Sequence, residues 1–260
     1  MNVPVGLGDR FQTARNVAVV VPVFRAPYDV LRDLVDQCRT AIEGLGYEFE
    51  IVLVFDCGSP EALFAVEQLK SSKGVNVILL PQNVGQQAAV LAGLKATQAD
   101  VCITVDEDGS ALTSCIPNLV EVIVDRSSDL ALGVAKVRNL SIVRRIGSKS
   151  MVLLGLIIFG SSAPSAWSSF RAMNRSVIDL LPDSLPSGGV LGFELFSVAR
   201  RVSEVPIPAA QMKPHVNLAS SYSPSMRLQY WCGAFRRYFF KNLISKLSNR
   251  RRVQCRIQRL

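Results

Sequence analysis

The sequence has only one histidine, His215, and its six cysteines include no CxxC pair. Structural zinc sites use cysteines and histidines at short spacings, and a Ser-His-Asp triad requires a suitably placed histidine. The composition therefore argues against zinc chemistry and against serine-hydrolase chemistry. The scattered cysteines favour a reduced, cytoplasmic chain over a disulfide framework.

Long hydrophobic runs are also missing. The longest apolar stretch, Met151–Phe159, is about half of the roughly 20 residues that a membrane-spanning helix needs. Residues 1–12 lack the apolar run that follows a positive start in a secretory signal. We therefore expect no signal peptide and no transmembrane helix.

Acidic residues are absent after Glu204, although the remaining residues hold 11 of the 29 lysines and arginines. We expect a body over residues 1–225 and a basic amphipathic tail over residues 226–260. One helical stripe of the tail is apolar: Leu228, Trp231, Phe235, Phe239, Leu243 and Leu247. The pattern favours an interfacial helix on an anionic membrane or, alternatively, a helix packed on the protein's own core. Nucleic-acid binding is disfavoured because no reading module accompanies the basic residues.

The first half alternates apolar β-branched runs with helical patterns. The predicted strands are 17–24, 49–55, 75–80 and 100–105, and the predicted helices between and after them are 28–45, 60–69, 85–97 and 116–125. Repeated strand–helix units specify a parallel sheet with right-handed crossovers. In the second half we expect strands at 129–134, 167–173 and 203–207, the last at a sheet edge that tolerates Pro206, and helices at 151–159, 175–181 and 193–202.

Two predicted strands end in acids, at Asp56 and at Asp106-Glu-Asp108. Ligands of such sheets bind beyond the carboxyl ends of the strands. Two carboxylates on one turn raise each other's pKa unless a cation neutralises them, and Mg²⁺ or Mn²⁺ would leave positions open for phosphate oxygens. The alternative is a solvated acidic turn that caps the next helix.

Several segments, in order along Val17 to Ser223, resemble glycosyltransferases of family two, in the branch of dolichyl-phosphate mannose synthase and bacterial polyprenyl-phosphate sugar transferases. They are Val19–Phe24, Val54–Ser59 (V-x-D-D-G-S), Asn83–Leu94 (N-x-G-x-x-A-A-x-x-A-G-L), Asp106–Glu121 (D-A-D-L-Q…), Ser169–Arg175 (G-F-R-A-x-x-R) and Glu204–Ile207 (E-V-P-I). The resemblance implies a GT-A fold, a Rossmann-like α/β architecture with a mostly parallel sheet, here followed by a C-terminal amphipathic helix.

The resemblance implies a metal-dependent, inverting transfer of sugar from a nucleotide-diphosphate donor to a polyprenyl phosphate or lipid-linked glycan at the inner face of the membrane. A hydroxyl of another glycan is the rival acceptor, and assembly into a homo-oligomer stays open. The implied donor-binding residues are Pro22, Val23, Asp56, Asp106, Lys136 or Arg138, and Arg144 or Arg145; Asp106 and Asp108 would bind Mg²⁺ or Mn²⁺. Asp108 and Glu194 are the catalytic candidates, with Glu194 either a general base or a structural helix carboxylate.

The sequence departs from the family pattern at Cys57, Gln82, Ser110 and Ser221, where the pattern has Asp, Arg, Gln and Lys. The last change removes the lysine of a loop that closes over the diphosphate, and Lys213 or His215 are candidate substitutes. These departures motivate a second hypothesis, a catalytically weakened scaffold that binds nucleotide sugars or partner proteins.

Overall fold

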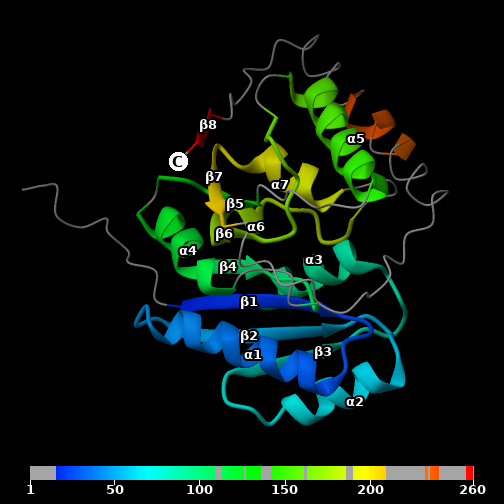
Figure 1. Cartoon of the computed structure of the whole chain (residues 1–260), viewed down its shortest axis with the longest axis vertical. Coiled ribbons are helices and arrows are strands. Elements are labelled where there is room, and N and C mark those ends of the chain that lie inside the picture. Colours follow the sequence, from blue (N-terminus) through cyan, green and yellow to red (C-terminus); the bar gives the residue numbers. More distant parts are fainter. Residues whose placement is uncertain are drawn as a thin grey trace, which may run out of the picture.

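The structure is a computed structural model of the whole chain (Figure 1). It describes residues 16–108, 113–125, 127–135, 142–160, 163–185, 190–208, 232–233, 235–239 and 256–259. Most of the predicted tail and residues 1–15 lie outside the described residues. Within the described part, no helix has the length and apolar character needed to cross a membrane.

The first half forms the predicted strand–helix units. They are β1 (Asn16–Val23), α1 (Tyr28–Glu43), β2 (Glu48–Phe55), α2 (Pro60–Leu69), β3 (Val75–Leu79), α3 (Gln86–Ala96) and β4 (Val101–Thr104). A short 3₁₀ turn, η1 (Thr113–Cys115), then leads into α4 (Ile116–Val124). The predicted elements and their order are confirmed.

The second half is less regular. Its elements are β5 (Leu130–Ala135), α5 (Ile142–Phe159), β6 (Arg171–Asn174), α6 (Arg175–Asp179), α7 (Leu191–Val198), β7 (Arg201–Ile207), the π-helical turn η4 (Phe235–Phe239) and β8 (Arg256–Arg259). Three predicted boundaries are wrong by more than two residues. Strand β6 begins at Arg171 instead of Trp167. Helix α5 begins at Ile142 instead of Met151, and α7 ends at Val198 instead of Val202 because Arg201 and Val202 already pair in the sheet.

The strands form one sheet in the order β3-β2-β1-β4-β6-β5-β7-β8. Neighbouring strands are parallel except around β6, which runs antiparallel to both β4 and β5. The predicted mostly parallel sheet is therefore confirmed.

Strand β7 was expected at the sheet edge, and this is wrong for residues 202–204, which pair with β8 on one side and β5 on the other. Pro206 lies beyond the residues that pair with β8, and among the described residues its one strand partner is Val134 of β5. The proline, which lacks an N–H, thus lies past the end of the β7–β8 pairing that the structure describes.

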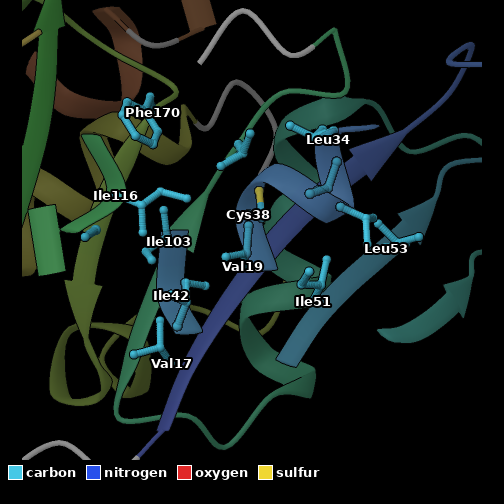
Figure 2. Packing of buried hydrophobic residues seen from close by; sticks show 14 of the residues in the cluster. Val17, Val19, Leu34, Cys38, Ile42, Ile51, Leu53, Ile103, Ile116 and Phe170 are labelled. Atoms are coloured by element: carbon cyan, nitrogen blue, oxygen red, sulfur yellow. The ribbon is translucent and has the colours of Figure 1, made fainter. Parts of the chain in front are cut away.

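Helices cover both faces of the sheet. Val17, Val19 and Val21 of β1 pack in a core with α1, α2 and α4, which Figure 2 shows around Cys38 and Ile103. Ala18 and Val20 point to the other face, where α3, α6 and α7 pack. Burial on both faces explains why β1 reads as an unbroken apolar run.

Candidate functional site

The carboxyl ends of β1, β2 and β4 meet at one edge of the sheet, as their parallel registers require. The backbone ties the following loops together, because Asp56 N donates to Val23 O (2.9 Å) and Ser59 N donates to Phe24 O (2.8 Å). Gly58 is required at this junction, since a Cβ there would lie 1.9 Å from Phe24 O. The acids predicted to follow β2 and β4 therefore do lie at the same edge.

Asp106, directly beyond β4, is half-buried and its carboxylate is fixed by two neutral donors. Gln86 Nε2 at the start of α3 donates to one oxygen (2.6 Å), and Ser169 Oγ donates to the other (2.5 Å). Burial is the main cause that raises the pKa of Asp106, and the negative charge of Asp108 raises it further. The Asp106 carboxylate is thus held in one orientation at a position where a cation would be favourable.

Arg171 of β6 supplies a buried positive charge near Asp106. Its Nε donates to Thr104 Oγ1 across the β4–β6 pair (3.3 Å), and the guanidinium lies against Gly192 of α7. Burial lowers the pKa of Arg171 to about 10, and the charge of Asp106 opposes that shift. Sequence analysis matched the F-R-A segment to the family but gave Arg171 no role.

Asp106 and Asp108 could bind a hard divalent cation whose coordination is completed by a bound ligand. The described residues contain no group of three or more metal-ligating side chains. Mg²⁺, however, is usually held by one or two carboxylates together with waters and substrate phosphates. Such an ion would also offset the charge of Asp108, which adds to the effect of burial in raising the pKa of Asp106.

Glu107, between the two predicted metal ligands, turns toward the β1–α1 loop. Its carboxylate accepts from Phe24 N (2.7 Å), Arg25 N (3.0 Å) and Ala26 N (3.0 Å). Sequence analysis did not identify this contact. The available signal was an acid at a position where the family motif has alanine.

Asp56 is buried and its carboxylate holds the loop before α3. Val84 N donates to one oxygen (2.7 Å) and Gly85 N to the other (2.9 Å), while Asn83 Nδ2 donates to the Asp56 carbonyl (3.0 Å). Burial raises the pKa of Asp56, and the two backbone donors lower it. The structure places Asp56 beside the ends of Pro22 and Val23, but its expected contact with a nucleoside stays a prediction.

Cys57 follows Asp56 in the turn and is the one non-glycine residue with positive φ (52°) among the described residues. Its side chain is exposed. The left-handed conformation is uncommon for a residue with a Cβ. Cys57, which replaces the Asp of the family pattern, therefore has a strained backbone and an exposed side chain at the rim of the site.

Two adjacent glutamines at the start of α3 connect the site to α7. Gln86 donates to Asp106, as described above, and Gln87 Oε1 accepts from Leu191 N (2.7 Å). These residues occupy the two unspecified positions between the glycine and the first alanine of the N-x-G-x-x-A-A segment. Sequence reasoning missed them because the motif does not constrain them.

Glu194 is 3% exposed and makes polar contacts with the described part of the C-terminal segment. Arg237 Nε donates to its carboxylate (3.1 Å), and so does the Tyr238 hydroxyl (2.9 Å). Tyr238 also accepts from Val190 N (3.2 Å), and burial raises its pKa. Glu194 therefore joins α7 to η4, which is what a structural carboxylate does; its role as a base stays a prediction.

The remaining predicted basic residues are described incompletely or not at all. Arg144 and Arg145 lie in the helical backbone of α5, but their side chains fall outside the description, and Lys136 and Arg138 lie outside the described residues. The same holds for Ser110, Lys213, His215 and Ser221. The phosphate contacts expected of Lys136 or Arg138, of Arg144 or Arg145, and of Lys213 or His215 therefore remain predictions.

Glu204, in the E-V-P-I segment, is buried and fixes the loop after α5. The backbone N–H of Ser165 donates to one carboxylate oxygen, and the Ser165 hydroxyl donates to the other (2.7 Å). Glu204 therefore has a structural role, because it fixes the loop that leads to Phe170 and Arg171.

Comparisons with known proteins give the same family that the sequence motifs indicate. The family model described as glycosyl transferase family 2 matches residues 18–181. The undecaprenyl-phosphate 4-deoxy-4-formamido-L-arabinose transferase of Edwardsiella ictaluri (strain 93-146) is 31% identical over 205 residues, and that of Klebsiella pneumoniae (strain 342) is 29% identical over 203 residues. Each alignment covers 77% of this chain, which spans 62% of the length of these relatives.

A solved structure shares the fold. Glucosyl-3-phosphoglycerate synthase from Mycobacterium tuberculosis, crystallised with Mn²⁺, UDP-glucose and phosphoglyceric acid, superposes with a TM-score of 0.56 at 16% identity, covering 91% of this chain and 81% of that one. The fold is of the GT-A type, as expected. The family match covers more than half of the sequence and includes β2 to β6, most of β1 and the acidic turn, and so the chain belongs to glycosyl transferase family 2.

Proposed function

We propose that this chain transfers a sugar from a nucleotide-diphosphate donor to a polyprenyl phosphate or a lipid-linked glycan. The observation that carries the proposal is the Asp106–Asp108 turn at the carboxyl edge of the sheet, with Asp106 oriented by Gln86 and Ser169. The names of the curated relatives, which are undecaprenyl-phosphate sugar transferases, support the acceptor class.

Asp106 and Asp108 would hold the divalent cation, either Mg²⁺ or Mn²⁺. Bound there, the ion would neutralise charge on the departing diphosphate. Gln86 and Ser169 keep the Asp106 carboxylate in place, so that little reorganisation is needed when the donor arrives. The β1–α1 loop and the Asp56 turn would receive the nucleoside beside it.

The transfer itself would be a single displacement that inverts the anomeric carbon. An acceptor oxygen forms the new bond to that carbon, while the bond to the diphosphate breaks and its electron pair leaves with the nucleotide. A phosphate acceptor is already ionised near neutral pH and needs no general base. This agrees with the position of Glu194, whose carboxylate already accepts from Arg237 and Tyr238.

Thermal shift with a panel of UDP-, GDP- and dTDP-sugars, each with and without Mn²⁺, tests donor binding. A ligand that binds the folded state raises the unfolding temperature, so that one base should stabilise the chain and Mn²⁺ should strengthen the effect. Release of the matching nucleotide diphosphate in the presence of undecaprenyl phosphate then tests turnover. Binding without release would favour the scaffold hypothesis.

We further propose that the chain attaches peripherally to the inner face of the membrane, through the basic tail and α5. Leu153, Leu156 and Ile157 are 55%, 46% and 44% exposed on one side of α5. Lys149 is exposed one turn earlier, and η4, with its exposed Arg236, packs against α5. In Figure 1, α5 and the orange η4 segment lie together at the end of the molecule opposite α2. Apolar side chains beside cations are typical of an interfacial surface.

Flotation with vesicles that contain anionic lipid tests this attachment. We expect the chain to float with them at low salt and to dissociate substantially at high salt, because the Debye length shrinks to about 3 Å at 1 M. Replacing Leu153, Leu156 and Ile157 with serine should reduce flotation at low salt. Leu180→Ser, at an exposed leucine outside this surface, is the matched control. Equal flotation of both variants would contradict a role for α5.

A further inference from the structure

The carboxylate of Glu107 is surrounded by three successive backbone N–H groups of the β1–α1 loop. The donor–acceptor distances from Phe24, Arg25 and Ala26 to Oε2 are 2.7, 3.0 and 3.0 Å, and Arg25 N also lies 3.2 Å from Oε1. Successive N–H groups that converge in this way form a concave site for an anion. Here the anion is a side chain that belongs to the acidic turn after β4.

The opposite side of the same loop is fixed by the turn after β2. Phe24 O accepts from Ser59 N (2.8 Å), and Gly58 passes so close to Phe24 O that a Cβ would not fit. The peptide groups of Phe24 are therefore held by Glu107 through the nitrogen and by the β2–α2 turn through the oxygen. Two independent elements determine the shape of one short loop.

We infer that Glu107 is a positioning residue that fixes the β1–α1 loop in the shape that receives the nucleoside of the donor. The inference rests on the proposed function, which places the nucleoside at the ends of Pro22 and Val23 and at Asp56. Hydrogen bonds to a charged acceptor are stronger than neutral ones, so three of them restrain the loop considerably. Glu107 does not contact the reacting atoms in this role.

The position of Glu107 also connects two parts of the donor site. Its neighbours Asp106 and Asp108 are the proposed cation ligands, so one turn holds both the diphosphate end and, through Glu107, the nucleoside end. A displacement of this turn on binding of one end would be transmitted to the other. Nucleoside affinity and cation affinity are therefore coupled through the chain itself as well as through the ligand.

The test compares the wild-type chain with Glu107→Gln and Glu107→Ala. Glutamine has nearly the same shape, but it is uncharged and offers only one acceptor oxygen, while its NH₂ group would face N–H donors. Alanine is the residue that the family motif has here, so this variant should fold even if the glutamine variant does not. Glu121→Gln, on the exposed face of α4, is the matched control.

Two readouts separate positioning from general stability. Hydrogen exchange at the amides of Phe24, Arg25 and Ala26 should accelerate in both Glu107 variants and stay unchanged in Glu121→Gln. The KM for the donor sugar nucleotide and the Kd of UDP or GDP should rise about tenfold or more, with kcat within about a factor of two, as expected when an interaction that supports binding alone is lost.

Unchanged exchange together with unchanged Kd and KM, while the wild type binds UDP or GDP, would overturn the inference and leave the proposed function intact. A fall in kcat with unchanged KM would also overturn it, because Glu107 would then act on the reaction step. A wild-type chain that binds none of UDP, GDP and dTDP would overturn the proposed function, and this inference with it.

Discussion

Asp108→Ala should abolish release of nucleotide diphosphate from the donor, with kcat/KM reduced at least about 100-fold. Removing one group that stabilises developing charge in an enclosed site typically costs two to three orders of magnitude in rate. In the variant, Asp106 would be the one proposed carboxylate ligand that remains. If this single carboxylate could not hold the cation, the loss of rate would be larger still. The measurement is nucleotide release with Mn²⁺ or Mg²⁺, compared with the thermal shift that each cation produces.

A matched variant keeps this result interpretable. Asp183→Ala removes an acid whose side chain is fully exposed and lies 3.7 Å from Lys95 Nζ, away from the turn. It should leave nucleotide release unchanged. If Asp108→Ala retained wild-type release, the metal-assisted reaction would be wrong; if neither wild type nor variant turned over but both bound donor, the chain would be a scaffold.

Glu194→Ala should destabilise the fold by about 1–3 kcal/mol, the usual cost of leaving a buried polar group without its partner, because the arginine of the ion pair is one-third exposed and can be hydrated. The change would leave Arg237 and the buried Tyr238 hydroxyl without their shared acceptor. Tyr238 lies among Phe193, Phe159 and the other aromatic rings of this small core, so the lost contact would not be replaced easily by water. Chemical denaturation of the purified chain measures the difference.

Companion variants decide whether Glu194 also acts as a base. Glu194→Gln keeps the shape and one acceptor oxygen but cannot take a proton, and Tyr238→Phe removes one hydrogen bond and leaves the carboxylate. If Glu194 is structural, Gln should lower stability while the remaining folded enzyme keeps kcat near wild type. Loss of kcat by 100-fold or more in Glu194→Gln, with stability unchanged, would instead identify a general base.

The first half of the fold could be predicted from the sequence because its signals are local. Strand β1 is buried on both faces and reads as a continuous apolar run, whereas α1 shows its buried positions at helical spacing, from Leu31 to Ile42. Each pattern spans a whole element, and the order of elements then restricts the topology. The parallel pairing of β1 to β4 follows from these features, whereas the order β3-β2-β1-β4 was not predicted.

The second half depended on pairing between distant segments. Nothing local indicates that β6 runs antiparallel between β4 and β5, or that Arg201 leaves the helical pattern of α7 to pair with the sheet. Strand β8 was not predicted at all, because Arg256–Arg259 has no apolar alternation that distinguishes it within a basic tail. These elements are determined by partners that lie 39 or more residues away in the chain.

The site was predictable to the same degree. Asp56, Asp106 and Asp108 follow buried strands, and the rule for ligand sites in parallel sheets places them correctly at one edge. The residues that orient or support them come from other elements: Gln86 from α3, Ser169 from the loop before β6, and Arg171 from β6 itself. These residues come close to the acids only in the folded chain, and their positions in the sequence do not indicate this proximity.

The proposed reaction requires a divalent cation at the Asp106–Asp108 turn. A crystal grown with Mn²⁺ and the sugar nucleotide that gives the largest thermal shift should show the ion at Asp108, with diphosphate oxygens completing its coordination and the nucleoside along the β1–α1 loop. An ordered donor with no ion at Asp106 or Asp108, or an ion held elsewhere in the chain, would contradict the central claim.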